Sequence, residues 1–213
     1  MRNSISLFIL ALFCNITFAQ MESYPKGGYA NLQEVFDKTP SSEFNVEIER
    51  RSKGKIKMVA GNDYQLNPID KLVKNKFLKN ELYAYSDGSI LLLNCKKYEI
   101  QFWYSKIEAE NDNYFVFRAG LPSNFERYGL EASNLPYMFG GIISGISAAK
   151  RALIRLPYIL DKKSEEVYIV SEEDILEYIG DNKDLKEKYV NEPQKGDVDI
   201  LMRYLIEWVN SSN

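Results

Sequence analysis

The sequence contains no histidine among its 213 residues. Histidine is the side chain that most often acts as a general base near neutral pH, and it is the commonest metal ligand. Its absence excludes Ser–His and Cys–His nucleophile pairs and leaves zinc without its usual imidazole donors. An enzyme built on carboxylates, tyrosines and lysines remains open, although the chain carries no recognisable catalytic motif.

Cysteine is scarce, and phosphate-binding loops are missing. Cys14 and Cys95 are the two cysteines in the chain, and neither G-x-x-x-x-G-K-S/T nor G-x-G-x-x-G occurs. The sequence therefore indicates no nucleotide, metal or other cofactor. A free cysteine is usually a small apolar core residue, and no histidine is present to activate Cys95. We expect Cys95 to lie in the core.

An excess of positive charge is also absent. The chain has 27 basic and 30 acidic residues, which gives a net charge of −3. Nucleic-acid-binding domains usually carry a basic patch and a high isoelectric point. Nucleic acid is therefore not an expected partner.

The first twenty residues, MRNSISLFILALFCNITFAQ, follow the pattern of a secretory signal peptide. Arg2 provides a short positive region, residues 5–13 are apolar, and Thr17 and Ala19 are small residues at positions −3 and −1 of a cleavage site. The apolar stretch is short for a membrane span. We predict cleavage after Ala19 and export to the periplasm or outside the cell.

A lipoprotein is the rival interpretation, because Cys14 could carry the lipid. It is disfavoured, since the acylated cysteine usually follows a small residue and Cys14 follows Phe13. Cleavage after Ala19 leaves a single domain, residues 20–213, with one cysteine and hence no internal disulfide. Packing alone must then stabilise the fold.

Periodicity predicts an α+β fold, with strands early in the chain and helices late. The sheet is mostly antiparallel and built from hairpins. Besides the strands we expect a short N-terminal helix, a Gly-rich helix or loop, and C-terminal helices. The segment 67–80 is basic and fits either a short helix or a covering loop. The predicted strands are 44–50 with 56–61, two runs flanking Asp87-Gly88, 98–105 with 114–119, and two runs within 153–170; the predicted helices are 31–38, 172–179, 184–190 and 198–209.

Several residues indicate where these elements begin and end. Asn31 is a predicted N-cap, Ser171 and Asp174 form a capping-box pattern, and Gly180 is a natural helix stop. Pro157 favours an edge or a bulge for its strand.

Acidic pairs are given structural roles. Asp197 and Asp199 flank the last predicted helix, and capping explains them better than calcium binding does. Glu47 and Glu49 alternate with apolar residues and fit the solvated face of a strand.

Aromatic residues are abundant, with 15 tyrosines in the chain. Aromatic side chains on a sheet can stack against sugars or peptides, and the candidate binding surface consists of Trp103, Tyr83, Tyr85 and Tyr104. Trp103 is the strongest candidate for an exposed ring, because polar residues share its face of the predicted strand. Core and cross-strand packing is the favoured alternative, since aromatics are good strand formers.

The segment FGGIISGISAAKR places Gly141, Gly145 and Ala149 four residues apart, on one face of a helix. We favour a buried helix or ordered loop that packs against the sheet. An oligomer or membrane contact through this face is an alternative, as is close approach to a ligand. A membrane span is disfavoured, because the uncharged run 132–149 contains several polar residues.

Three segments, GGYANLQEVFDKTP, KGKIKMVAGNDYQL and YAYSDGSILLLNC, resemble an uncharacterised family of exported proteins from Gram-negative bacteria. The resemblance covers most of residues 27–175. It implies export and an α+β fold. It supplies no catalytic residues and implies no activity.

The leading functional hypothesis is a non-enzymatic exported module that binds an envelope protein or glycan. One alternative is a small carboxylate-based enzyme that acts on glycan or peptide. Another is an oligomeric or membrane-associated protein that uses the Gly141, Gly145 and Ala149 face.

Overall fold

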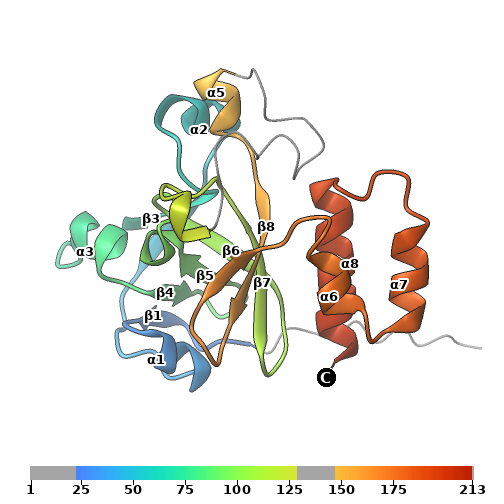
Figure 1. Cartoon of the computed structure of the whole chain (residues 1–213). Coiled ribbons are helices and arrows are strands. Elements are labelled where there is room, and N and C mark those ends of the chain that lie inside the picture. Colours follow the sequence, from blue (N-terminus) through green and yellow to red (C-terminus); the bar gives the residue numbers. More distant parts are fainter. Residues whose placement is uncertain (1–22, 129–146, 213) are drawn as a thin grey trace, which may run out of the picture.

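The computed structural model describes residues 23–128 and 147–212. The predicted signal peptide, Gly141 and Gly145 lie outside these residues. The described chain is an α+β fold built on a nine-stranded sheet (Figure 1), as the sequence predicts. All strand pairs in the described chain are antiparallel.

The N-terminal elements are β1 (Gly27–Tyr29) and α1 (Leu32–Phe36). The Asn31 side chain caps α1 by accepting a hydrogen bond from the Glu34 backbone N–H at 2.9 Å. The Glu34 carboxylate in turn accepts from the Ala30 N–H at 2.7 Å. The bond from the Glu34 N–H to the Asn31 side chain confirms the predicted cap and its position.

The predicted hairpin partner of residues 44–50 is wrong. β2 (Val46–Arg50) pairs with β3 (Tyr64–Pro68), and residues between them form α2 (Lys53–Val59). Ser52 caps α2 through the Lys55 N–H, so the chain enters a helix where the apolar pattern resembles a strand. Ala60 and Gly61 then have φ values of 52° and 89°, which end the helix.

The hairpin around Asp87-Gly88 is confirmed by β4 (Ala84–Ser86) and β5 (Leu91–Asn94). The Asp87 carboxylate accepts from the N–H groups of Ser89 and Ile90, and Gly88 has a φ of 96°. The ambiguous basic segment before it contains both an exposed loop and α3 (Asn75–Asn80).

The strand predicted over 98–105 is wrong for most of its length. A 3₁₀ turn, η1 (Cys95–Tyr98), precedes β6 (Tyr104–Glu110), which pairs with β7 (Tyr114–Ala119) across the expected 110–113 turn. The strand starts late because Glu99, Gln101 and Trp103 all have positive φ. Such a backbone cannot maintain the alternation of a strand.

The chain continues through η2 (Glu126–Tyr128), α5 (Ala148–Arg151), β8 (Leu156–Asp161) and β9 (Val167–Ile169). The edge position expected for the strand of Pro157 is wrong, because β8 lies between β7 and β9. Pro157 is tolerated because it lies just beyond the last β8–β9 residue pair, Tyr158 with Ile169. Its carbonyl still accepts from the Val170 N–H.

Three C-terminal helices, α6 (Ile175–Ile179), α7 (Lys183–Val190) and α8 (Val198–Ser211), form what we call the helix layer. Their caps are as expected: the Ser171 and Asp174 side chains bond reciprocally with each other's backbone N–H, and Asp197 accepts from two N–H groups of α8. Figure 1 shows this layer on one side of the sheet, with α7 outermost.

The sheet order is β1-β4-β5-β6-β7-β8-β9, with β3 joining at β6 and β2 beyond β3. Alternating residues of β7 face two cores: Phe115 and Phe117 pack with α1, whereas Val116 packs with α6 and α8. A third core lies beneath α3, around Leu66, Leu78 and Tyr104. In residues 23–128 and 147–212, no helix has the length and apolar content needed to cross a membrane.

Candidate functional site

Buried polar groups gather at the end of the sheet near α2 and α5 (Figure 1). They come from the end of β2, the start of β3, the segment before β6 and the start of β8. We call this cluster the Gly61 junction. It consists of Arg51, Gly61, Asn62, Asp63, Gln101, Trp103 and Arg155.

Asn62 lies at the centre of the junction and has no exposed surface. Its amide nitrogen donates to the carbonyls of Ile100 at 3.3 Å and Phe102 at 3.2 Å, and its amide oxygen accepts from the Gly120 N–H at 2.7 Å. The Asn62 backbone N–H also donates to the Phe102 carbonyl. One side chain thereby joins the β3 start, the segment before β6 and the end of β7.

Gly61 has a φ of 89° and is closely surrounded. A Cβ placed on it would lie 2.8 Å from an Arg51 guanidinium nitrogen and 2.8 Å from a ring carbon of Trp103. The Gly61 N–H donates to the Gln101 side chain at 3.1 Å, and its carbonyl accepts from Arg155 at 3.2 Å. Glycine is required here both for its φ and for the lack of a side chain.

The junction holds two guanidinium groups and one carboxylate. Arg155 donates twice to Asp63, at 2.9 and 2.7 Å. Arg51 is only 5% exposed and donates to the Asn62 carbonyl at 2.8 Å. Burial lowers the pKa of the Arg51 guanidinium, and the neighbouring charge of Arg155 lowers it further. The carboxylates of Glu49 and Asp63 act on the Arg51 pKa in the opposite direction.

Backbone strain is concentrated in the same place. Of the six non-glycine residues with positive φ in the described chain, four are Ala60, Glu99, Gln101 and Trp103. A non-glycine residue in this region costs about 1 kcal/mol or more. Strained residues held by surrounding hydrogen bonds are often found at functional sites.

Aromatic rings form the outer side of the junction. Trp103 is half-buried and Phe102 is 39% exposed. The Lys79 ammonium lies 4.7 Å from the centre of the Phe102 ring and 5.3 Å from that of Trp103. A ligand at the junction would therefore meet two rings, a cation and the partly exposed Asp63.

The remaining residues of the predicted aromatic surface do not join Trp103. Tyr85 is 1% exposed and Tyr104 is fully buried, both in the core beneath α3. The Tyr104 hydroxyl donates to the Leu78 carbonyl. Half-buried Tyr83 packs edge-on against Tyr98. These rings are therefore distributed over two cores, with Tyr83 packed against one and Tyr85 and Tyr104 in the other.

Of the predicted helix face formed by Gly141, Gly145 and Ala149, which we call the glycine face, the structure describes Ala149. Ala149 lies in α5 and is half-buried, whereas Gly141 and Gly145 lie outside the described residues. α5 packs beside α2. The roles expected for this face remain predictions.

Cys95 lies in the core, as expected from the sequence. Burial raises the pKa of its thiol to about 12. Glu47 is exposed, and Glu49 pairs with Lys55 of α2. In the described ranges, no three acidic or cysteine side chains are placed to share a metal ion.

Two further polar clusters lie elsewhere on the described chain. Buried Glu110 accepts from the Tyr24 hydroxyl at 2.5 Å and pairs with Lys162 at 3.4 Å, which ties the start of the domain to the β6–β7 turn. An open groove of about 430 Å³ lies beside Lys26, Asn45 and Asp70, whose polar groups mostly bond one another. The Gly61 junction differs from both because four of the six positive-φ non-glycine residues of the described chain lie in it or beside it.

Sequence reasoning missed Arg51, Asn62 and Arg155. None of the three belongs to a recognisable sequence motif, and their separation along the chain gives no sign that they meet in the fold. The run Ala60-Gly61-Asn62-Asp63 is rich in turn-forming residues, and this was the available signal.

A family model described as "Family of unknown function (DUF6563)" matches residues 27–212, and the chain belongs to this family. The match includes the whole Gly61 junction and the helix layer. It confirms the uncharacterised family expected from the sequence. No curated protein matches the chain, and no solved structure does.

Proposed function

We propose that this member of the family is an exported, non-enzymatic module of the Gram-negative cell envelope that binds an acidic glycan at the Gly61 junction. The observation that carries this proposal is the presence of two guanidinium groups and one carboxylate beside a partly exposed tryptophan. Export rests on the signal-peptide pattern of residues 1–19.

A buried charge is costly unless an opposite charge lies near it. Arg155 is tied to Asp63, so a ligand carboxylate would compete with Asp63 for the same guanidinium. Arginine suits this role because its planar donors match a carboxylate. The rings of Trp103 and Phe102 would supply the flat apolar surface on which a sugar ring stacks.

Isothermal titration calorimetry with a galacturonic acid trimer tests the proposal, with a galactose trimer as the uncharged comparison. We expect the acidic sugar to bind more tightly than the neutral one. Arg155→Gln should weaken acidic-sugar binding about tenfold, because a charge-assisted pair is lost. Asp63→Asn should tighten it, because the competing carboxylate is removed.

Arg203→Gln is the matched control, since Arg203 is an exposed arginine on α8 with a single carboxylate partner, Glu192. Its affinity should equal that of the unmodified protein. Equal binding of both sugars, or equal effects of the two arginine variants, would contradict the proposal. Asp63→Asn keeps the test decisive if Arg155→Gln unfolds the protein.

The carboxylate-enzyme alternative gains no support at the junction, where Asp63 is the single carboxylate and Arg155 binds it. The oligomer alternative depends on Gly141 and Gly145. Native mass spectrometry of the unmodified chain and of Gly145→Leu would test it, because a bulky side chain should separate a dimer built on that face.

A further inference from the structure

A second surface lies away from the junction, in the chain that joins β3 to the first turn of α3. We call residues 69–76 the lysine loop. Leu72 is 94% exposed, more than any other large apolar side chain in the described chain, and Ile69 is 63% exposed. Large apolar side chains that remain this exposed often mark an interaction surface when they occur together.

The apolar side chains of the lysine loop are surrounded by like charges. Lys71, Lys74 and Lys76 are all exposed, and the sequence from Lys71 to Asn80 contains no acidic residue. Asp70 at the start of the loop is engaged, because its carboxylate accepts from the Asn45 N–H at 2.8 Å. A local excess of positive charge therefore exists on a chain whose net charge is −3.

One more lysine lies at the base of the loop. Lys26 and Asp70 line the same open groove, and the Lys26 ammonium donates to the Asn45 side chain at 3.1 Å. Glu43, on the same groove, is an acidic residue nearby. Counting these neighbours, basic groups around the loop still outnumber acidic ones.

The conformation of the lysine loop is fixed by contacts between its buried side and the core beneath α3. Val73 and Phe77 pack against the core beneath α3, and Phe77 meets Phe44 edge-on with ring centres 5.9 Å apart. The Ile69 N–H donates to the Asn45 carbonyl at 3.1 Å. The fold therefore partly buries Val73 while it keeps its neighbour Leu72 in solvent.

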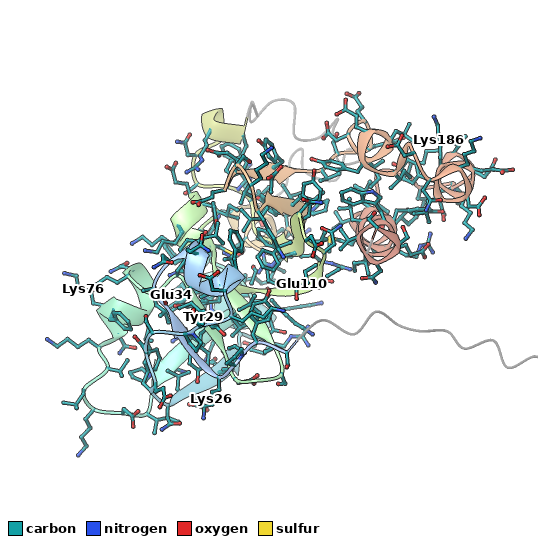
Figure 2. The ribbon with its side chains drawn as sticks, turned by 90° about the horizontal axis from the view of Figure 1, so that it is seen from below. Lys26, Tyr29, Glu34, Lys76, Glu110 and Lys186 are labelled. Carbon is teal, nitrogen blue, oxygen red and sulfur yellow. The ribbon has the colours of Figure 1, made fainter. Side chains whose placement is uncertain are left out.

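The loop lies far from the helix layer. Figure 1 shows α3 on the side of the sheet away from α7, and in Figure 2 Lys76 and Lys186 project from opposite ends of the molecule. α7 also carries three exposed lysines and an exposed Val190. There, however, Asp184 and Glu187 alternate with the lysines, so α7 offers a matched surface with a smaller excess of positive charge.

We propose that the lysine loop docks the protein on the surface of an anionic phospholipid bilayer. Ile69 and Leu72 would enter the boundary between headgroups and acyl chains, and the lysines would contact lipid phosphates. A membrane suits this arrangement better than a folded partner does. The two apolar side chains lie close together in one loop and are interspersed with lysines, and lipids can rearrange around each side chain.

This docking surface is independent of the glycan proposal and of the glycine face. It rests on residues 69–76, whereas the membrane contact considered from the sequence rests on residues 141–149. Either proposal can fail while the other holds.

Vesicle cosedimentation of the full chain tests the inference. The probes are vesicles of phosphatidylcholine alone and vesicles with equal parts of phosphatidylcholine and phosphatidylglycerol. The measured quantity is the ratio of the two affinities, because any apolar contribution from residues 1–19 enters both. We expect a strong preference for the anionic vesicles, which should fall as added salt screens the lysines.

Changing Lys71, Lys74 and Lys76 together to Gln should reduce the preference by up to about 100-fold, at about fivefold for each lysine. Changing Lys183, Lys186 and Lys188 of α7 to Gln removes the same charge and should leave the preference nearly unchanged. Equal effects of the two triple variants would overturn the inference, because binding would then follow net charge alone.

The apolar contribution has its own test. Leu72→Ser should weaken binding to the anionic vesicles about tenfold, whereas Val190→Ser should not change it. All changed side chains are exposed, so the thermal midpoint should stay constant and report intact folding. Failure of the unmodified chain to prefer anionic vesicles would overturn the inference. So would tighter binding to duplex DNA that Leu72→Ser leaves unchanged, because that result would assign the lysines to another polyanion.

Discussion

The helix layer and the Gly61 junction both fasten distant parts of the chain to the sheet, but they use different interactions. In the helix layer, Val116 and Ile159 of the sheet meet Ile175 and Leu205 of the helices, and all four are fully buried. In the junction, the central contacts are the hydrogen bonds of Asn62. One region depends on apolar volume and the other on specific partners.

The difference bears on function. Apolar contacts bury surface without directional demands, so the helix layer needs no strained backbone. The junction combines positive φ at Gln101 and Trp103 with the buried charge of Arg51, features that reduce stability unless surrounding bonds compensate. A region that serves stability alone would be expected to use apolar packing, as the helix layer does. This difference supports the binding proposed for the junction and a supporting role for the helices.

The largest effect should come from Asn62→Leu, which conserves volume but removes the amide. The Gly120 N–H and the Ile100 carbonyl would be left buried without their partner, and each such loss costs about 1–3 kcal/mol. We expect about 4 kcal/mol less stability in urea unfolding. Asn67→Leu, at a half-exposed site in β3, should cost less than about 1 kcal/mol. Similar losses of stability for the two variants would contradict the claim that the junction depends on the hydrogen bonds of Asn62.

The helix layer should respond to volume instead. Leu205→Ala should cost about 3 kcal/mol, because it leaves a cavity at a fully buried position. Leu205→Met keeps the volume and should cost less than about 1.5 kcal/mol by the same urea measurement. An equal loss of unfolding free energy for Leu205→Met and Leu205→Ala would contradict the claim that the helix layer depends on apolar volume.

The contrast also explains which parts of the structure could be predicted from the sequence. The helix layer could be predicted from local signals. Apolar residues at helical spacing, the Asp197 cap and the Gly180 stop all lie within or next to the helices that they determine. The Asp87-Gly88 hairpin is equally local. Confirmed elements are those whose determinants lie within a few residues of one another.

The junction could not be predicted in this way. Asn62 holds the carbonyls of Ile100 and Phe102, about forty residues away, and this contact replaces the strand that alternation predicts over 98–105. The strand predicted over residues 56–61 is wrong for a related reason. Their apolar pattern fits a strand, but the Ser52 cap starts a helix and Gly61 must fit between Arg51 and Trp103. Tertiary contacts overrode local preference at both places.

A smaller effect should follow Asp63→Asn, which keeps the shape of the junction but removes its carboxylate. Arg155 would then lose its ion-pair partner, while Arg51 would keep Glu49 as a nearby carboxylate, at a cost of about 1 kcal/mol because Asp63 is partly exposed. Added sulfate should restore part of the lost thermal stability by supplying an anion. Asp184→Asn on α7 should show neither the loss nor the recovery. A sulfate response shared by both variants would mean that the anion acts generally and not at the junction.

The smallest effect should come from an acidic group of the sheet that lies beside the helix layer. Glu108 of β6 lies 3.3 Å from Arg118, which also pairs with Asp199 at the start of α8. Burial raises the pKa of Glu108, and the charge of Arg118 only partly opposes this. A raised pKa in the folded state means that Glu108 favours folding below its unfolded pKa, near 4.5, and loses that contribution as the pH rises through the folded value.

Glu108→Gln should therefore gain stability relative to the unmodified protein as the pH rises from about 4 to 7, by less than about 1 kcal/mol. Urea unfolding at several pH values would measure the difference, with the exposed Glu187→Gln on α7 as the control. The opposite trend, in which the unmodified protein gains on the variant, would mean that the ion pair with Arg118 outweighs desolvation. In that case the helix layer would depend on a charge pair as the junction does, and the contrast between the two regions would narrow.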